Sequence, residues 1–181
     1  MNIYDVSNKA GVSIATVSRV LNGNARVSLA TRKKVLDAMK ELDYTPNVFA
    51  RGLGLNTMKT IGIMCIDSSD IYLANAVYYL EQELRKHSYD SILCCTGKDY
   101  TNKKKYLELL LSKRVDGIIL AGSQFVENTD TYNNDYIINA AKDIPIVLVN
   151  GYLDAPNIYS VMCNDEIAIY NATNLLINNG H

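Results

Sequence analysis

Apolar side chains in the first 42 residues recur at helical spacing in three separate segments. The three stripes are Ile3, Val6 and Ala10; Val17, Val20 and Leu21; and Val35, Met39 and Leu42. Gly11 separates the first two segments, and glycine adopts a positive φ in a tight turn without steric cost. Ser13 and Ser28 precede the second and third segments and are favourable N-cap residues. The pattern predicts three short helices, the first two forming a helix-turn-helix, with an ordinary helical hairpin as the alternative.

From Thr60 onward the pattern changes to short apolar runs that alternate with amphipathic stretches. The predicted strands cover residues 61–66, 91–96, 117–121, 145–149 and 158–163, and the predicted helices cover residues 71–87, 102–113, 136–142 and 166–178. Continuous apolar strands separated by helices indicate a parallel sheet covered on both faces. We therefore predict an α/β fold: a three-helix headpiece followed by a parallel sheet flanked by helices.

The boundary between the two patterns predicts the domain organisation. Residues 43–46 end the third helix, because the proline at position 46 disfavours a helical conformation in the residue before it. The predicted domains are a headpiece over residues 1–46, a hinge or linker over residues 47–59, and a second domain over residues 60–181.

The net charge of −1 conceals an asymmetry between these parts. Residues 1–60 contain nine lysines and arginines against four acidic residues, whereas residues 61–181 contain nine against fifteen. A basic head on an acidic body is expected where only the head meets phosphate. A solvated basic face is the alternative, and the neighbouring helix pair favours nucleic-acid binding.

Other classes of protein lack support in the sequence. No apolar run is long enough for a membrane helix, and polar residues interrupt the N-terminus where a signal peptide needs an apolar segment. We therefore expect a cytoplasmic protein without membrane contact. The sequence contains no catalytic set, phosphate-binding glycine loop or zinc-ligand spacing, so we expect neither an enzyme nor a cofactor or metal. Buried, reduced thiols are expected at Cys65, Cys94, Cys95 and Cys163.

The headpiece closely resembles the start of the lactose-repressor (LacI/GalR) family of bacterial transcription regulators. The matching residues include Tyr4-Asp5-Val6, Ala10-Gly11-Val12-Ser13, Thr16-Val17-Ser18-Arg19-Val20, Val27-Ser28 and Pro46-Asn47. The resemblance continues more loosely to His181 and includes the periplasmic-binding-protein-like sheet of that family. It implies a repressor on the nucleoid that is a homodimer when full-length and that binds a pseudo-palindromic operator in double-stranded DNA. It also implies control by a small-molecule effector such as a sugar or sugar derivative.

In this family the first turns of the second helix contact base edges. The resemblance therefore assigns base reading to Ile14, Ala15, Thr16 and Arg19. Arg19 can donate two hydrogen bonds to a guanine, which contributes about 1–3 kcal/mol of discrimination, and Ala15 fits against a thymine methyl group.

Contacts to the DNA backbone are expected from polar residues around this helix. The predicted set is Tyr4, Ser13, Ser18, Asn22, Arg26, Ser28 and Thr31. Simple helix capping is the alternative role for Ser13 and Ser28. For the hydroxyls of Thr16 and Ser18 the alternative is a hydrogen bond to the preceding helical turn.

The resemblance also implies a hinge helix that forms on operator DNA and enters the minor groove. The residues assigned to that contact are Asn47, Ala50 and Leu53, with the leucine wedged into a base step. Gly52 and Gly54 depart from the family pattern, and each lowers helix stability by about 1 kcal/mol relative to alanine. We expect a hinge that is poorly helical without DNA; a flexible glycine-containing linker is the alternative.

Effector contacts are expected at the carboxyl ends of the strands, where open parallel sheets bind ligands. The segment from Asp67 to Tyr72 aligns without a gap with the family's effector loop, although Ile66 and Ile71 replace common prolines. The predicted effector-binding residues are Asp67, Ser69, Tyr72, Ser123, Asn150 and Asp165. A polar loop residue or a helix cap is the alternative role for each, above all for Asp165.

The sequence stops just after a predicted helix, where chains of this family cross from one effector-binding subdomain to the next. We therefore expect a truncated chain with a headpiece, a hinge and most of one subdomain. Two other interpretations are a sugar-binding protein of the periplasmic type and a repressor fragment without activity of its own. The basic headpiece and the lack of a signal peptide weigh against the periplasmic protein.

Overall fold

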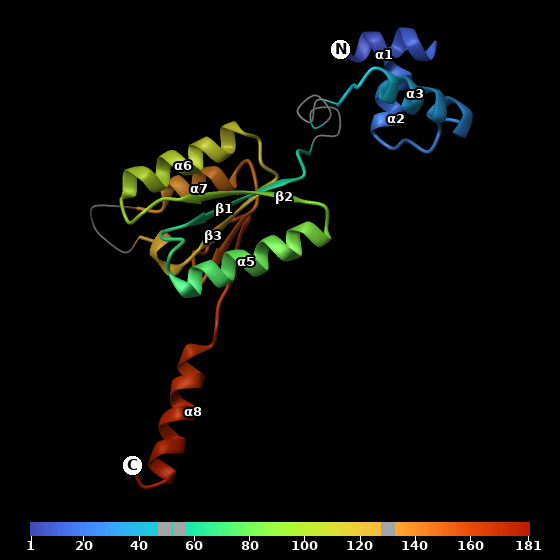
Figure 1. Cartoon of the computed structure of the whole chain (residues 1–181). Helices are drawn as coiled ribbons and strands as arrows, with labels where there is room; N and C mark the ends of the chain where they lie inside the picture. Colours follow the sequence, from blue (N-terminus) through green and yellow to red (C-terminus); the bar gives the residue numbers. More distant parts are fainter. Residues whose placement is uncertain (47–51, 53–56, 128–132) are drawn as a thin grey trace. The chain divides into compact units, whose positions relative to one another are not determined.

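The computed structural model describes residues 1–46, 52, 57–127 and 133–181, and the chain divides into two compact units (Figure 1). The first unit is Met1–Met58 and the second is Lys59–His181. The predicted hinge helix and the hinge contacts at Asn47, Ala50 and Leu53 lie outside the described residues.

Residues 1–46 of the first unit contain three helices: α1 (Ile3–Ala10), α2 (Ile14–Leu21) and α3 (Leu29–Glu41). Asn2 begins α1 with a capping box, in which its side chain accepts hydrogen bonds from backbone N–H groups and Asp5 accepts one from the Asn2 N–H. Gly11 ends α1 with a φ of 64°, the left-handed conformation that favours glycine. The predicted helix-turn-helix is therefore confirmed.

The core of the headpiece consists of side chains from all three helices. Val6, Val17, Val20, Val35 and Ala38 are buried. The other residues of the predicted stripes, among them Leu21 and Met39, are partly buried around this cluster. Because the apolar face of each helix points inward, the polar side chains of α2 remain on its outer surfaces.

The second unit is built on a five-stranded parallel sheet. Its strands are β1 (Thr60–Cys65), β2 (Asp90–Cys95), β3 (Gly117–Ala121), β4 (Ile146–Val149) and β5 (Ile158–Val161), in the order β2-β1-β3-β4-β5. The helices are α5 (Ile71–Lys86), α6 (Tyr100–Ser112), α7 (Asp135–Ala141) and α8 (Asp165–Asn178), with a 3-10 helix η1 (Ser123–Phe125). The α/β architecture is confirmed, and η1 is the element that the sequence pattern did not predict.

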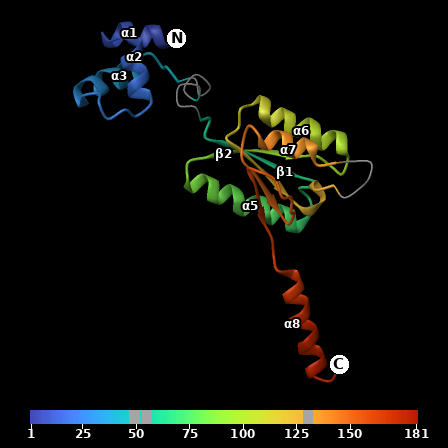
Figure 2. The same ribbon diagram turned by 180° about the vertical axis from the view of Figure 1, so that it is seen from behind.

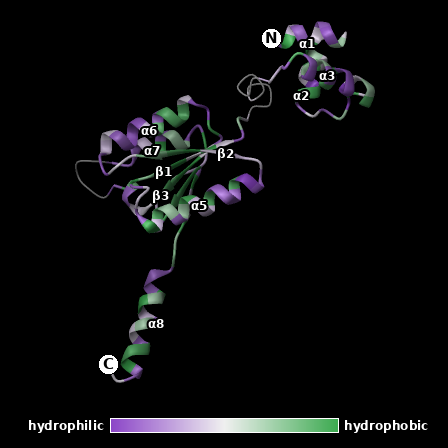
Figure 3. Cartoon of the chain, in the orientation of Figure 1, coloured by the Kyte–Doolittle hydropathy of each residue, from purple (hydrophilic) through white to green (hydrophobic). Residues whose placement is uncertain are grey.

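Helices α5, α6 and α7 cover the two faces of the sheet. α5 lies on one face, and α6 and α7 lie together on the other (Figures 1 and 2). The strands are strongly hydrophobic (Figure 3), and Met64, Ile118, Leu120 and Ile146 are fully buried within the unit. Gly62 of β1 contacts α6 closely, because an added Cβ would lie 2.7 Å from a methyl carbon of Leu110.

The strand order creates a switch point between β1 and β3. The chain passes from β1 to β2 on one side and then returns to place β3 on the other side of β1. At such a point the loops that leave the two strands diverge, and a crevice opens at the carboxyl edge of the sheet. The fold therefore positions the loops after β1, β3 and β4 around one location.

The expectation that all four cysteines are buried is wrong for two of them. Cys65 and Cys94 are buried, whereas Cys95 and Cys163 are exposed. Cys95 ends the edge strand β2, and Cys163 follows the other edge strand β5. An edge strand has a neighbour on only one side, so an apolar sequence run at this place does not ensure burial.

Candidate nucleic-acid interface and ligand pocket

The outer surface of α2 presents the residues predicted to read bases. Ile14, Ala15 and Arg19 are exposed, while Val17 and Val20 hold the opposite face of the helix in the headpiece core. Thr16 is partly buried. The helix therefore offers two small or apolar side chains and one guanidinium group to a partner.

A serine N-cap begins each of α2 and α3, and in both cases its partner is the threonine three residues later. The Ser13 Oγ accepts a hydrogen bond from the Thr16 N–H at 3.2 Å and lies 3.0 Å from the Thr16 hydroxyl. The Ser28 Oγ accepts one from the Thr31 N–H at 3.2 Å and donates one to the Thr31 hydroxyl at 2.9 Å. Both serines thus cap their helices, and the Thr31 hydroxyl keeps its own hydrogen to donate to another group. Both helix N-termini also favour an anion through the helix dipole.

A surface hollow of about 450 Å³ connects α2, the loop after it and the start of α3. Its lining residues are Thr16, Arg19, Asn24, Arg26, Val27, Ser28 and Thr31. Five of these seven are predicted DNA contacts. Two guanidinium groups and three hydroxyls without a carboxylate form a lining suited to phosphate oxygens.

Asn24 is a residue of this hollow that sequence reasoning missed. Its side-chain oxygen accepts a hydrogen bond from the Arg26 N–H at 2.9 Å, and its carbonyl oxygen accepts one from the Arg32 guanidinium at 2.9 Å. These bonds shape the loop that carries Arg26. The Asn22-Gly23-Asn24 segment is typical of a tight turn and was the available signal.

The remaining predicted backbone contacts lie outside the hollow. Tyr4 is exposed on α1, Ser18 is partly buried on α2, Asn22 forms the C-cap of α2, and Ser13 forms its N-cap. The structure thus brings part of the predicted set together and leaves the others distributed over the headpiece surface.

A pocket of about 280 Å³ lies at the carboxyl edge of the sheet, at the switch point. Its lining residues are Ile66, Asp70, Tyr72, Leu73, Gly122, Ser123, Gln124 and Asn150. The Asn150 side-chain amide donates a hydrogen bond to the Tyr72 hydroxyl at 2.6 Å, which joins the start of α5 to the end of β4. The pocket combines an aromatic ring, a carboxylate, two hydroxyls and two amides with the apolar side chains of Ile66 and Leu73.

Three of the six predicted effector residues line this pocket: Tyr72, Ser123 and Asn150. Asp67 and Ser69 instead bond to each other, since both the N–H and the hydroxyl of Ser69 donate to the Asp67 carboxylate at 2.8 and 2.7 Å. These bonds hold the pKa of Asp67 below its usual value. Asp165 opens α8 next to its N-cap and is not a lining residue.

The sequence reasoning missed Asp70 and Gln124 as pocket residues. Asp70 also caps α5 by accepting a hydrogen bond from the Leu73 N–H at 2.9 Å. An aspartate between a strand end and a helix start was a usable signal for this position. Gln124 belongs to η1, for which the hydrophobic pattern contained no signal.

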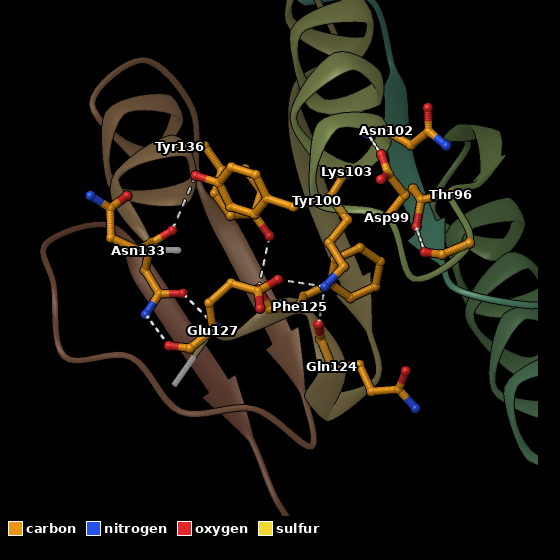
Figure 4. A network of polar contacts seen from close by, with 12 residues as sticks. Thr96, Asp99, Tyr100, Asn102, Lys103, Gln124, Phe125, Glu127, Asn133 and Tyr136 are labelled. Atoms are coloured by element: carbon orange, nitrogen blue, oxygen red, sulfur yellow. Dashed lines mark hydrogen bonds and ion pairs between the residues drawn. The ribbon is translucent and has the colours of Figure 1, made fainter. Parts of the chain in front are cut away.

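Side chains from α6 and α7 fix the backbone of η1, which contributes Ser123 and Gln124 to the pocket lining (Figure 4). The Lys103 ammonium group donates to the Gln124 carbonyl oxygen and to the Glu127 carboxylate, each at 2.5 Å. The Tyr136 hydroxyl donates to the Phe125 carbonyl oxygen at 2.8 Å, and burial raises the pKa of this tyrosine above its usual value. The part of the pocket lining that belongs to η1 is therefore held in place by a largely buried polar network.

The described part of the chain contains no helix long and apolar enough to cross a membrane. It also contains no group of three or more histidine, cysteine or acidic side chains placed to hold a metal ion.

Two family models match this chain. Residues 2–47 match the model of bacterial regulatory proteins of the lacI family, and residues 58–181 match that of periplasmic binding proteins and the sugar binding domain of the LacI family.

Individual relatives and structures agree with these matches. An HTH-type transcriptional regulator of Lachnoclostridium phytofermentans is 66% identical over 180 residues, which are 99% of this chain and 54% of the relative. The HTH-type transcriptional repressor PurR of Vibrio cholerae is 34% identical over 179 residues, which are 99% of this chain and 52% of that protein. The lac repressor dimer bound to operator and the anti-inducer ONPF matches with a TM-score of 0.80 and 25% identity, over 100% of this chain and 53% of the repressor chain. The chain spans about half the length of the curated relatives it matches.

Proposed function

Because this chain belongs to the LacI family of bacterial regulatory proteins, we propose that it acts in a transcription repressor that binds operator DNA under the control of a small-molecule effector. In this proposal residues 1–46 bind DNA, residues 47–59 form the hinge, and residues 60–181 contribute to the effector-binding domain. In this proposal the full-length protein works as a homodimer on a pseudo-palindromic operator, in the cytoplasm and on the nucleoid.

The hollow beside α2 is the observation that carries the proposal. It collects Arg19, Arg26 and three hydroxyl groups next to the exposed face of a short helix. A short helix with basic and hydroxyl side chains beside it suits the major groove, because the helix can contact base edges while these side chains contact phosphates.

The headpiece side chains divide into two proposed roles. Ile14, Ala15, Thr16 and Arg19 meet base edges from the exposed surface of α2. The contacts to phosphates and sugars come from Tyr4, Ser13, Ser18, Asn22, Arg26, Ser28 and Thr31. The Thr31 hydroxyl suits this role well, since it accepts from Ser28 and retains a hydrogen to donate. We further propose minor-groove contacts by Asn47, Ala50 and Leu53.

The pocket at the sheet edge is the proposed effector site. An aromatic ring can stack on the apolar face of a sugar, and carboxylate, amide and hydroxyl groups can bond its hydroxyls. Tyr72, Ser123 and Asn150 carry this role together with Asp70 and Gln124. Asp67, Ser69 and Asp165 lie outside the pocket lining, so their proposed contribution depends on contacts with an effector that extends beyond it.

Selection of binding sites from random DNA tests the DNA-binding proposal. We expect the 181-residue chain to enrich a motif, and Arg19→Ala to weaken binding to that motif by about 1–3 kcal/mol and to relax the preference for one guanine per half-site. Lys105→Ala is a charge-matched control, because it removes an exposed cation from α6 in the second unit. We expect this control to enrich the wild-type motif. Absence of any enriched motif, or the same motif from the Arg19 variant, contradicts the assignment.

A further inference from the structure

Two thiols lie side by side at the carboxyl ends of β1 and β2. Cys65 and Cys95 are register partners in the parallel ladder and are the last residues of their strands. Their sulfur atoms are 3.6 Å apart. Paired residues of neighbouring strands project to the same face of a sheet, whereas Cys94, adjacent to Cys95, projects to the opposite face. The two sulfurs thus share one side of the sheet without the third thiol of this region.

The spacing of the pair suits a covalent bond between the sulfurs. Disulfides join residues whose Cα atoms are about 4.4–6.8 Å apart, and neighbouring strands lie about 4.8 Å apart. A disulfide length of about 2.0 Å requires the sulfurs to approach by about 1.5 Å. Both cysteines are the last residues of their strands and are followed by loops. The sulfurs can therefore approach through a movement of the strand ends that leaves the centre of the sheet in place.

The two thiols differ in their access to solvent. Cys95 is exposed and Cys65 is fully buried. Burial and the hydrogen bond with Cys95 raise the pKa of Cys65 to about 12, so Cys65 is a neutral thiol at neutral pH. An exposed thiol that can meet an oxidant, with a second thiol in contact behind it, is the arrangement of an attacking and a resolving cysteine.

We propose that Cys65 and Cys95 are a redox-active pair that a peroxide oxidises to an intramolecular disulfide. The Cys95 thiolate attacks one oxygen of hydrogen peroxide, the O–O bond breaks, and Cys95 becomes a sulfenic acid. The hydroxide that departs takes up the proton that Cys95 lost on ionisation and becomes the first water. The Cys65 sulfur then attacks the Cys95 sulfur, an S–S bond forms and the S–O bond breaks. The departing hydroxide takes the proton of Cys65 as water. The two thiols lose two electrons, and the peroxide is reduced to two waters.

This site adjoins the proposed effector pocket and does not depend on it. Ile66 follows Cys65 and lines the pocket. The loops after the two strands are joined by the Thr96 N–H, which donates to the Cys65 carbonyl oxygen at 2.9 Å, and by the Gly97 N–H, which donates to the Ile66 carbonyl oxygen at 3.0 Å. The chemistry of the pair can therefore be tested without an effector or DNA.

Mass spectrometry of the oxidised 181-residue chain tests the proposal. The reduced protein is treated with equimolar hydrogen peroxide, denatured and labelled with N-ethylmaleimide. We expect a monomer that has lost two hydrogens and labels at two of its four cysteines. Trypsin should release the peptide of residues 60–85 linked to that of residues 87–98, and dithiothreitol should separate them. The variant Cys94→Ala should form the same link, which assigns it to Cys95.

Two variants of exposed cysteines control the experiment. We expect Cys95→Ser to retain its circular dichroism spectrum and to label at Cys65 after oxidation, because the attacking thiol is gone. Cys163→Ser removes the other exposed thiol and should form the disulfide as the wild type does. Full labelling of Cys65 in the oxidised wild type overturns the proposal. The proposal is also overturned if oxidised Cys95 is found only in intermolecular disulfides or as a sulfinic acid.

Discussion

The ammonium group of Lys103 is a charged group held almost entirely inside the second unit. Its side chain is 4% exposed, and that of its partner Glu127 is 14% exposed. Removing an ammonium ion from water is unfavourable by several kcal/mol, so the group must be compensated where it lies. The Glu127 carboxylate, the Gln124 carbonyl oxygen and the ring of Phe125, 5.9 Å from the nitrogen, supply that compensation.

Replacement of Lys103 by methionine should destabilise the second unit strongly. The variant leaves the Glu127 carboxylate largely buried without its cation, and breaking a buried pair in this way lowers the free energy of unfolding by about 3–5 kcal/mol. Urea unfolding followed by circular dichroism measures the change.

The neighbouring lysine provides the control for this measurement. Lys105 lies two residues away on the same helix and is exposed, so Lys105→Met should change the free energy of unfolding by less than about 0.5 kcal/mol. The double variant Lys103→Met with Glu127→Gln should recover part of the loss, because it removes the unpaired charge. Equal effects of the two lysine variants would mean that the ion pair contributes little.

The sequence offered no means to distinguish these lysines. Lys103, Lys104 and Lys105 are consecutive, and a run of three cations on an amphipathic helix reads as a solvated face. Only the packing of η1 against α6 distinguishes Lys103, because its position on the helix turns it toward the Gln124 carbonyl oxygen (Figure 4).

At the scale of elements, the close contact between β1 and α6 depends on a glycine, which has no side chain. Gly62 lies in the middle of β1, and a Cβ there would come within 2.7 Å of one methyl carbon of Leu110 and 3.0 Å of the other. Leu110 is fully buried, so its neighbours limit how far it can move. The glycine thus lets α6 approach the sheet closely.

Substitution of Gly62 by alanine should separate these elements and destabilise the unit. Overpacking a core of this kind costs about 1–3 kcal/mol. Thermal or urea unfolding measures the effect. In a protein that already carries Leu110→Val, the substitution Gly62→Ala should lower the free energy of unfolding by a smaller amount, because the shorter side chain makes room for the new methyl group.

Gly117 in β3 is the matched control, since its added Cβ would lie no nearer than 3.4 Å to another atom. We expect Gly117→Ala to change the free energy of unfolding by less than about 1 kcal/mol, because an ordinary van der Waals contact carries no overpacking penalty. A Gly62 variant as stable as this control would show that the close approach to Leu110 is unimportant.

At the scale of the whole molecule, the sheet and α8 contribute differently to the core. All residues of α8 are exposed or nearly so, including Ile167, Ile169, Tyr170 and Leu175. Figure 3 shows hydrophobic residues along much of this helix. By contrast, the core of the second unit comes from the strands, α6, α7 and η1.

Polar substitution of α8 should therefore leave the stability of the sheet unchanged. The double variant Ile169→Ser with Leu175→Ser removes apolar side chains that are 67% and 66% exposed. Surface changes of this kind usually alter the free energy of unfolding by less than about 0.5 kcal/mol per site. Urea unfolding of the 181-residue chain at low protein concentration measures the change.

Ile137→Ser in α7 is the control for this prediction, because Ile137 is fully buried and its replacement should destabilise the unit by more than about 2 kcal/mol. A loss of more than about 1 kcal/mol in the α8 variant would contradict the independence of this helix from the folded core.

The sequence by itself determined the α-helices and strands described in both units, but not the 3-10 helix η1. Helical spacing of apolar residues and the serine caps located α1, α2 and α3, and apolar runs located all five strands to within about two residues. This succeeded because local burial and capping depend on neighbours along the chain. The same reasoning predicted which surface of α2 is exposed, and we propose that this surface contacts DNA.

Only the tertiary structure decided which side chains meet across elements. It placed Asp70 and Gln124 with Tyr72 and Asn150 in one pocket, whose lining does not include Asp67 or Ser69. It also brought Cys65 and Cys95 into contact and left Cys95 exposed on an edge strand. Such pairings depend on strand order and register, which join residues far apart in sequence and which the local hydrophobic pattern does not encode.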